Sequence, residues 1–138
     1  AETIIPKTNT PGAKEAAVGQ FMATYSKDCY NEIQRKTLKE GISQLNEASE
    51  KMNNSSFMEA TSVQRQNLLT AIDAEAKKYN KEQSGTERPP HYFTLMKQLV
   101  LFGFFTSKPG VTQVLRYMPV PGKYESCIDY KEGETSWA

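Results

Sequence analysis

Apolar residues recur along most of this chain at the spacing of an α-helix, and no stretch alternates apolar and polar residues as a strand does. The first apolar stripe follows Thr10 and Pro11, residue types that are favoured at the N-cap and at the first helical position. We therefore expect a first helix with Thr10 as its N-cap and Pro11 as its first residue. Its apolar stripe consists of Val18, Phe21, Met22, Tyr25 and Cys29.

Two longer amphipathic patterns follow, separated by the polar residues 53–56, which favour caps and turns. The first pattern predicts a helix from about Asn31. The second predicts a helix from about Thr61, because Thr61 and Gln64 have the spacing of a capping box. The expected buried positions are Leu38, Ile42, Leu45 and Met52 in the second helix and Leu68, Leu69, Ile72, Ala76 and Tyr79 in the third.

A polar stretch over residues 80–90 predicts a loop, and an almost wholly apolar helix follows over residues 91–106. Residues 107–110 end that helix, and residues 111–117 predict a short fifth one. Prolines, glycines and scattered aromatic residues from Met118 onward predict an irregular segment laid across the surface. The expected fold is all-α: a small irregular bundle of four to five helices with an irregular C-terminal segment, in one domain spanning residues 1–138.

The fourth predicted helix carries apolar residues on two sides. Its main face holds Leu95, Met96, Leu99, Phe102 and Gly103, and the opposite side begins with polar residues but continues to Leu101 and Phe105. Either the C-terminal segment covers Leu101 and Phe105, or they are exposed and belong to a partner surface. A helix wholly buried within its own domain is the simpler reading, and both readings stay open here.

Composition excludes several classes of protein. The 138 residues suit one domain, and 17 Lys+Arg against 16 Asp+Glu leave a net charge of +1, without the basic surface that nucleic acids or anionic membranes attract. The longest apolar run, residues 99–105, is far shorter than the roughly 18 to 20 residues of a membrane-spanning helix. We therefore expect neither nucleic-acid binding nor a direct membrane span.

Residues suited to catalysis or metal binding are scarce. His91 is the single histidine and lies at a predicted helix start without a motif that would pair it with a nucleophile, so we read it as structural. The two cysteines, Cys29 and Cys127, lack the spacing of a metal site. They suit an intramolecular disulfide, free buried thiols, or a bridge from one cysteine to a partner chain. We expect no catalytic, cofactor-binding or metal-binding residue in this chain.

Short motifs near the two ends are more specific than the helical pattern. The N-terminal motifs are Thr3-Ile4-Ile5-Pro6, Thr10-Pro11-Gly12-Ala13 and Val18. The C-terminal motifs are Phe104-Phe105-Thr106-Ser107, Gly110-Val111-Thr112-Gln113, Leu115-Arg116-Tyr117, Pro119-Val120-Pro121-Gly122, Tyr124 and Cys127. In order and spacing these motifs resemble the gluconate 2-dehydrogenase subunit 3 family, and the middle of the chain is similar in helical pattern and at Gly41-Ile42 and Phe57.

The resemblance implies an accessory role. Members of that family are the small, non-flavin subunits of membrane-associated sugar or sugar-acid dehydrogenases, in which a large subunit carries FAD and a multihaem cytochrome c subunit often accepts the electrons. They commonly begin with a twin-arginine export signal, which we expect upstream of Ala1. The resemblance therefore implies a periplasmic or otherwise extracytoplasmic protein, attached to the membrane through its partners, that stabilises and helps to export the flavoprotein. The alternative is a stand-alone exported helical binding module without enzyme association.

A candidate docking surface follows from the resemblance and from residue chemistry, since aromatic residues and an arginine beside rigid prolines make good interface material. Its expected members are Leu101, Phe105, Arg116, Tyr117, Pro119, Pro121, Tyr124 and Trp137. The competing interpretation is that these residues tether the C-terminal segment to its own bundle. Arg116 has a third candidate role, capping the last carbonyls of the fifth helix.

Overall fold

In the computed structural model, which describes residues 1–85, 88–120, 122–124, 126–129 and 131–138, the chain is helical apart from its ends and connections. The helices are α1 (Val18–Asp28), α2 (Glu32–Asn53), α3 (Ser62–Glu82), α4 (Tyr92–Phe105) and the short π-helical turn η1 (Gly110–Val114). Within those described ranges there is no strand, only one isolated parallel bridge between Arg116 and Trp137. The predicted all-α class is confirmed.

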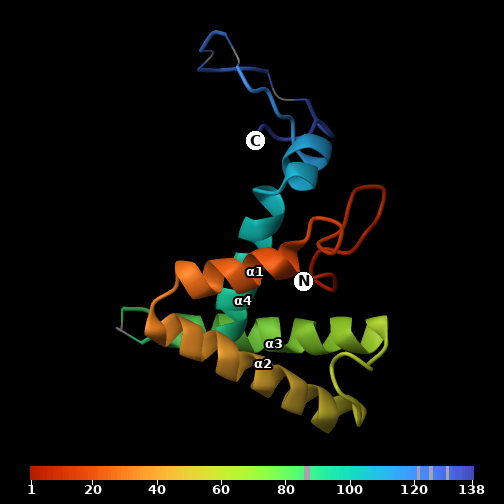
Figure 1. Ribbon diagram of the computed structural model, residues 1–138, viewed down its shortest axis with the longest axis vertical. Coiled ribbons are helices and arrows are strands. Elements are labelled where there is room, and N and C mark those ends of the chain that lie inside the picture. Colours follow the sequence, from red (N-terminus) through yellow and green to blue (C-terminus); the bar gives the residue numbers. More distant parts are fainter. Residues whose placement is uncertain (86–87, 121, 125, 130) are drawn as a thin grey trace.

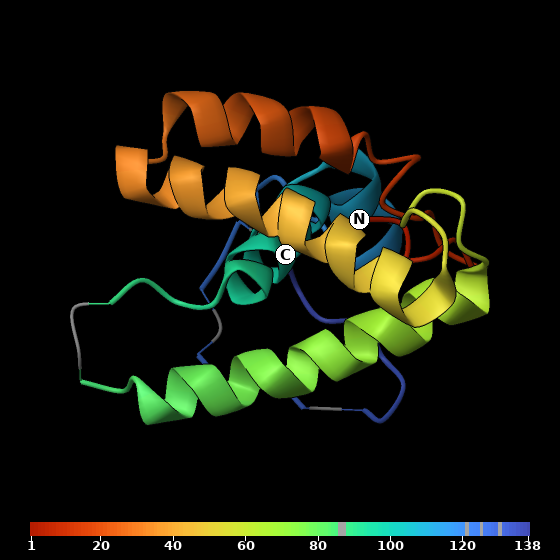
Figure 2. The same ribbon diagram turned by 90° about the horizontal axis from the view of Figure 1, so that it is seen from below.

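Helix α4 is the centre of the bundle. The hairpin of α2 and α3 lies at its lower end and α1 crosses it higher up, while η1 and the C-terminal segment extend beyond its upper end (Figure 1). Seen from below, α4 runs between α1 and α2 on one side and α3 on the other (Figure 2). Helix α4 contacts every other helix, which explains why its sequence is apolar on nearly all sides.

Three clusters of buried side chains form the core, and α4 contributes to each of them. The first joins Ala13 and Val18 to Val100 and Phe104, the second joins Leu38 to Leu95, Met96 and Leu99, and the third joins Leu68, Ile72 and Ala76 to Phe93. Each cluster therefore packs a different neighbouring helix against α4. This part of the molecule is held together by burial of apolar surface.

The predicted starts of α2 and α3 are confirmed. Both depend on capping residues that lie close together in the sequence. The Asn31 side chain accepts from the Gln34 backbone N–H at 2.9 Å, and the Gln34 side chain accepts from the Asn31 N–H at 3.1 Å. Thr61 and Gln64 form the same reciprocal pair. Each box satisfies two backbone donors that a helix start would otherwise leave unpaired.

The predicted start of the first helix is wrong. Helix α1 begins at Val18, after a residue in the left-handed conformation, Ala17, with a φ of 52°. The N-terminal segment folds back on itself instead, since the Glu2 carboxylate accepts from the backbone N–H groups of Lys7 at 3.2 Å and Lys14 at 2.6 Å. A distant carboxylate therefore takes the Lys14 N–H, a donor that the predicted helix would have used.

Helix α4 agrees with the prediction, since His91 is its N-cap and Thr106 its C-cap, but the fifth helix is shorter than expected. In η1 the Leu115 N–H donates to the Gly110 carbonyl, five residues back, at 3.1 Å. Gly110 is buried against the end of α4, and a Cβ on it would overlap the carbonyl oxygen of Phe104. This contact between η1 and α4 sets where the chain leaves the bundle.

Several predicted core positions are instead exposed. Ile42 and Met52 of α2 are 60% and 55% exposed, and Phe102 of α4 is 45% exposed. Gly41 takes the place of Ile42 in the contact with α4, where the ring of Tyr92 lies against it. The bundle is too small to cover every apolar side chain on the long helix α2.

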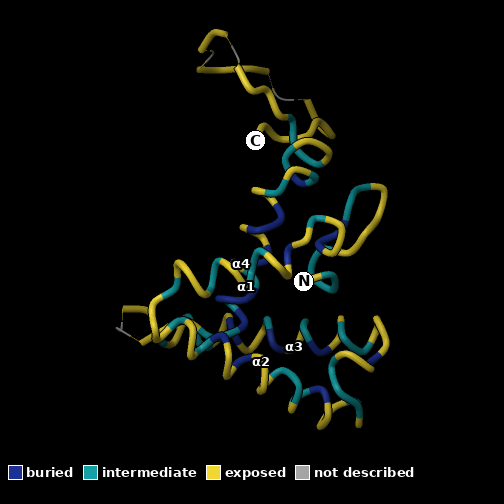
Figure 3. The backbone as a smooth tube through the Cα atoms, in the orientation of Figure 1, coloured by how far each residue is buried: buried dark blue, intermediate teal, exposed yellow. Residues whose placement is uncertain are grey.

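The C-terminal segment, residues 115–138, projects from the bundle and does not lie across it, so that prediction is also wrong (Figures 1 and 3). Every described residue from Tyr117 onward is exposed. Ile4, Ile5 and Val114 already pack against the cluster containing Val100 and Phe104, and Leu101 and Phe105 stay exposed. The segment folds back on itself instead.

Candidate functional site

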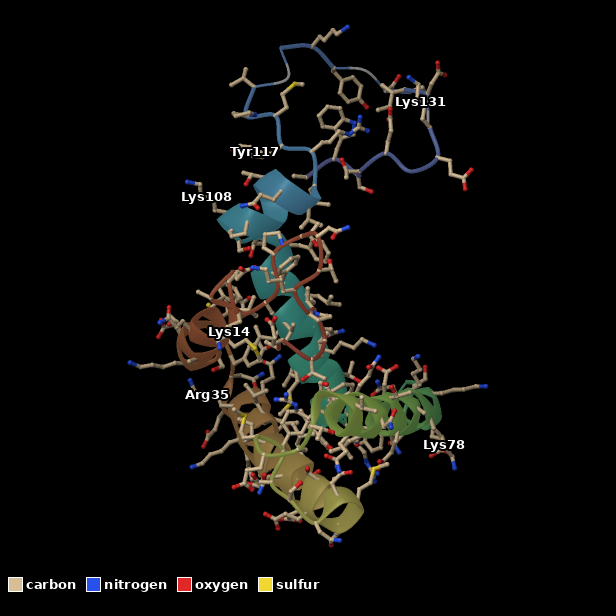
Figure 4. The ribbon with its side chains drawn as sticks, turned by 90° about the vertical axis from the view of Figure 1, so that its right-hand side faces the viewer. Lys14, Arg35, Lys78, Lys108, Tyr117 and Lys131 are labelled. Carbon is tan, nitrogen blue, oxygen red and sulfur yellow. The ribbon has the colours of Figure 1, made fainter. Side chains whose placement is uncertain are left out.

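Exposed apolar side chains gather on the C-terminal segment. Figure 4 places Tyr117 where the segment leaves η1 and Lys131 on the far limb of the same loop, beyond the side chains of the bundle. Tyr124 is 91% exposed and Val120 is 80% exposed. The other large apolar side chains exposed here are Tyr117, Met118, Ile128 and Trp137. A stretch this rich in uncovered apolar surface is the strongest candidate for an interaction site in the described residues.

Arg116 closes this loop at its base. Its backbone N–H donates to the Ser136 carbonyl at 2.8 Å, and its carbonyl accepts from the Ala138 N–H at 3.0 Å. Its side chain pairs with the Glu134 carboxylate at 3.3 Å, and its guanidinium carbon lies 4.4 Å from the centre of the Trp137 ring. Four contacts from one residue thus join the start of the segment to its end.

A cleft of about 510 Å³ opens between the two limbs of the loop. Aromatic, thioether and aliphatic side chains form most of its wall, with cationic groups beside them. The lining residues are Arg116, Tyr117, Met118, Lys123, Tyr124, Ile128, Trp137 and Ala138. This composition suits an apolar side chain or short apolar segment of another molecule.

The structure brings several predicted docking residues together and leaves others apart. Arg116, Tyr117, Tyr124 and Trp137 share the cleft, and Pro119 is exposed between them in the chain. Pro121 lies outside the described residues. The interpretation that these residues tether the segment to its own bundle is not what the structure shows. Arg116 does not cap η1 either, since its side chain is engaged by Glu134 and Trp137.

Leu101 and Phe105 form a second exposed group, on α4. They are 38% and 41% exposed, so the C-terminal segment does not cover them. Their neighbour Phe102 is shielded on one side, because its ring lies 5.5 Å from that of Phe21 and 5.2 Å from that of Tyr25. Their membership of a partner surface stays a prediction, and they are separated from the cleft by η1.

His91 has a structural environment. Its Nδ1 accepts from the Phe93 backbone N–H at 3.2 Å, which caps α4, and its ring lies 4.4 Å from that of Tyr92. Its backbone N–H donates to the Asn80 side chain at 3.0 Å, which ties the start of α4 to the end of α3. Burial lowers the pKa of the imidazole below its usual value. A neutral ring with Nδ1 as acceptor is the form that this geometry requires.

The two cysteines do not form the intramolecular bridge in this structure. Both are free and exposed, so the alternative of buried thiols does not hold either. The physical reason is their position: Cys29 follows the last residue of α1, whereas Cys127 belongs to the C-terminal segment beyond η1. Among the described residues, no group of three or more His, Cys, Asp or Glu side chains is placed to hold a metal ion.

Sequence reasoning missed four residues that line the cleft: Met118, Lys123, Ile128 and Ala138. It also missed Glu134, the ion partner of Arg116. No spacing rule links Arg116 to Glu134, because they meet only when the intervening loop closes. The sequence signal for this return of the chain was its glycines. In the structure Gly122 and Gly133 have positive φ values of 74° and 83°, which glycine adopts readily. Glycines that reverse the chain predict a loop that returns toward its own start.

Comparison with known proteins gives one match. The family model of gluconate 2-dehydrogenase subunit 3 matches residues 1–122 of the chain. No curated protein and no solved structure matches this chain. Across the part of the chain that the structure describes, no helix combines the length and apolar character needed to cross a membrane.

Proposed function

The chain belongs to the gluconate 2-dehydrogenase subunit 3 family, and from this premise we propose that it is the accessory subunit of an exported FAD-dependent gluconate-type dehydrogenase complex. In this role it is non-catalytic, and it stabilises the flavoprotein subunit and aids its export. FAD is bound by that partner and not by this chain. A multihaem cytochrome c subunit is a further expected partner, and the complex works in the periplasm or another extracytoplasmic compartment.

One observation carries the proposal: the family match extends over the whole helical bundle and into the exposed C-terminal segment. It includes Tyr117, Met118 and Val120, which are 56%, 49% and 80% exposed. Within a single chain such side chains have no packing role. Buried against another subunit, they would supply the apolar area that holds two proteins together.

The distribution of chemistry in the chain supports a non-catalytic role. Its single histidine caps a helix, and the cleft in the C-terminal segment is lined by groups that bind apolar surface. The oxidation of a sugar acid needs a hydride acceptor such as FAD, and we assign that chemistry to the partner. The contribution of this chain is then to present a docking surface from a rigid bundle.

The proposal is tested by co-expression with the flavoprotein encoded nearest to this chain. A tag on this chain is used for a pull-down, and flavin absorbance is read in the eluate. A yellow, stoichiometric complex is the expected result. A colourless eluate that contains this chain alone would favour the stand-alone binding module.

A second measurement addresses stabilisation and export separately. The flavoprotein is expressed with and without this chain, and its activity is measured in the cytoplasmic and extracytoplasmic fractions. We expect the extracytoplasmic activity to be lost when the chain is omitted. Full activity of the flavoprotein in that fraction without this chain would contradict the accessory role.

A further inference from the structure

The docking loop, defined as residues 117–136, has no core of its own. Each of its described residues is exposed, so burial of apolar side chains cannot determine its shape. Among the described residues, Arg116 joins the start of the loop to Glu134, Ser136, Trp137 and Ala138 at its returning end. This closure bounds the 510 Å³ cleft, because Arg116, Trp137 and Ala138 are themselves among its lining residues.

The closure has a backbone part and a side-chain part. The two backbone hydrogen bonds between Arg116 and the pair Ser136 and Ala138 form a short parallel bridge. One bridge of this kind is weak by itself, because the loop between its ends must be ordered to make it. The guanidinium adds a charge pair with Glu134 and a stacked contact with Trp137, both on the returning limb. Arginine suits this position because its planar group can pair and stack at once.

We propose that Arg116 is the positioning residue of the docking loop: by clasping Glu134 and Trp137 it preorganises the apolar cleft that receives the flavoprotein partner. The inference rests on the proposed function for the identity of the partner. Its occupant is an apolar segment of that subunit, because most of the cleft wall is apolar or aromatic and the family match reaches the first limb of the cleft, at Arg116, Tyr117 and Met118. A loop already closed before association loses less conformational entropy on binding than an open one.

The contacts of the Arg116 side chain with Glu134 and Trp137, called the clasp below, can be observed without any partner. Trp137 is the single tryptophan of the chain, so its fluorescence reports on the clasp alone. Removing the guanidinium in Arg116→Ala is expected to expose the indole ring, which would raise its quenching by acrylamide and shift its emission to longer wavelength. Trypsin cleavage after Lys123 and Lys131 should become faster in the same variant, because an open loop is a better protease substrate.

Partner binding is then measured for a set of variants with matched controls. Arg116→Ala is expected to weaken binding by about tenfold or more, since several interface side chains must then be ordered on association. Glu134→Gln should weaken binding in the same direction. Arg116→Lys should fall between wild type and Arg116→Ala, because lysine keeps the charge and loses the planar stack. Lys131→Ala is the control, since it removes a cation from the same loop without touching the clasp.

The outcomes separate the clasp from the proposed function. If Glu134→Gln opens the loop but binds as wild type does, the positioning role is overturned and the docking surface stands. If Trp137 emission and trypsin cleavage are unchanged in Arg116→Ala, the clasp itself is overturned. If wild type does not bind the flavoprotein although the loop is closed, the proposed function fails and so does the positioning role. Circular dichroism and the Tm of each variant confirm that the bundle is intact.

Discussion

The helical bundle and the C-terminal segment of this protein are held in shape by different forces. In the bundle, α4 places a buried cluster against each neighbouring element, and side chains such as Leu99, Val100 and Phe104 are 1–2% exposed. In the C-terminal segment a few polar, stacking and backbone contacts around Arg116 replace a core. A region stabilised by burial resists change, whereas a segment whose described side chains are exposed leaves its apolar groups available to a partner.

The largest effect is expected from truncating the core of the bundle. Phe104→Ala removes a side chain that is 2% exposed, so it should lower the free energy of unfolding by about 3–5 kcal/mol. Phe105→Ala is the matched control, because Phe105 is the next residue of the same helix and is 41% exposed. Its expected loss is about 1 kcal/mol or less. Urea denaturation followed by circular dichroism measures both, and equal losses would contradict the burial assigned to Phe104.

Two glycines should respond in opposite directions to the same substitution. A Cβ on Gly41 would lie 2.6 Å from the ring of Tyr92, so Gly41→Ala should destabilise the bundle by about 1–3 kcal/mol. A Cβ on Gly19 meets nothing within 4 Å, so Gly19→Ala should stabilise α1 by up to about 1 kcal/mol. Thermal unfolding of the two variants decides the matter. A stabilised Gly41→Ala variant would mean that α2 and α4 are not in close contact.

The stability of the bundle should fall in mild acid because of His91. Burial lowers the pKa of its imidazole in the folded state, so the unfolded chain binds the proton more readily. The stabilisation is therefore complete above the unfolded pKa, near 6.5, and is lost as the pH falls from there through the folded pKa. Protonation also removes the Nδ1 acceptor that caps α4. Because the ring is partly exposed, we expect a loss below about 1 kcal/mol.

The control for this prediction is His91→Asn, since asparagine is a good N-cap and does not titrate. The variant should keep most of its stability at pH 8 and should lose the change in stability between pH 7 and pH 5. Urea midpoints measured at both pH values provide the test. Since His91 is the single histidine of the chain, a pH dependence that persists in the variant would have to come from another group.

A structural feature could be predicted from the sequence when the residues that form it lie close together along the chain. The starts of α2 and α3 could be predicted because Asn31 and Thr61 each meet a partner only three residues away. The start of α1 could not, because it depends on the Glu2 carboxylate accepting from the Lys14 N–H. Aromatic chemistry identified Tyr117 and Tyr124 as candidate docking residues. The closure by Arg116 and Glu134 could not be found, since it exists only after the loop returns.

The smallest effect on stability is expected in the C-terminal segment, together with a clear effect on association. Tyr124 is 91% exposed, so Tyr124→Ala should change the free energy of unfolding by no more than about 0.5 kcal/mol. The same variant should bind the flavoprotein partner more weakly, by a factor of roughly 5 or more, if the ring enters the interface.

Met58→Ala is the control, because Met58 is 80% exposed and lies in the connection between α2 and α3, away from the docking loop. Its loss of apolar surface should leave both stability and binding unchanged. Pull-down yields and urea midpoints of the two variants are measured side by side, and a Tyr124→Ala variant that binds like Met58→Ala would remove Tyr124 from the docking surface. A variant that unfolds more easily would instead show that the segment contributes to the bundle, against the division of forces described above.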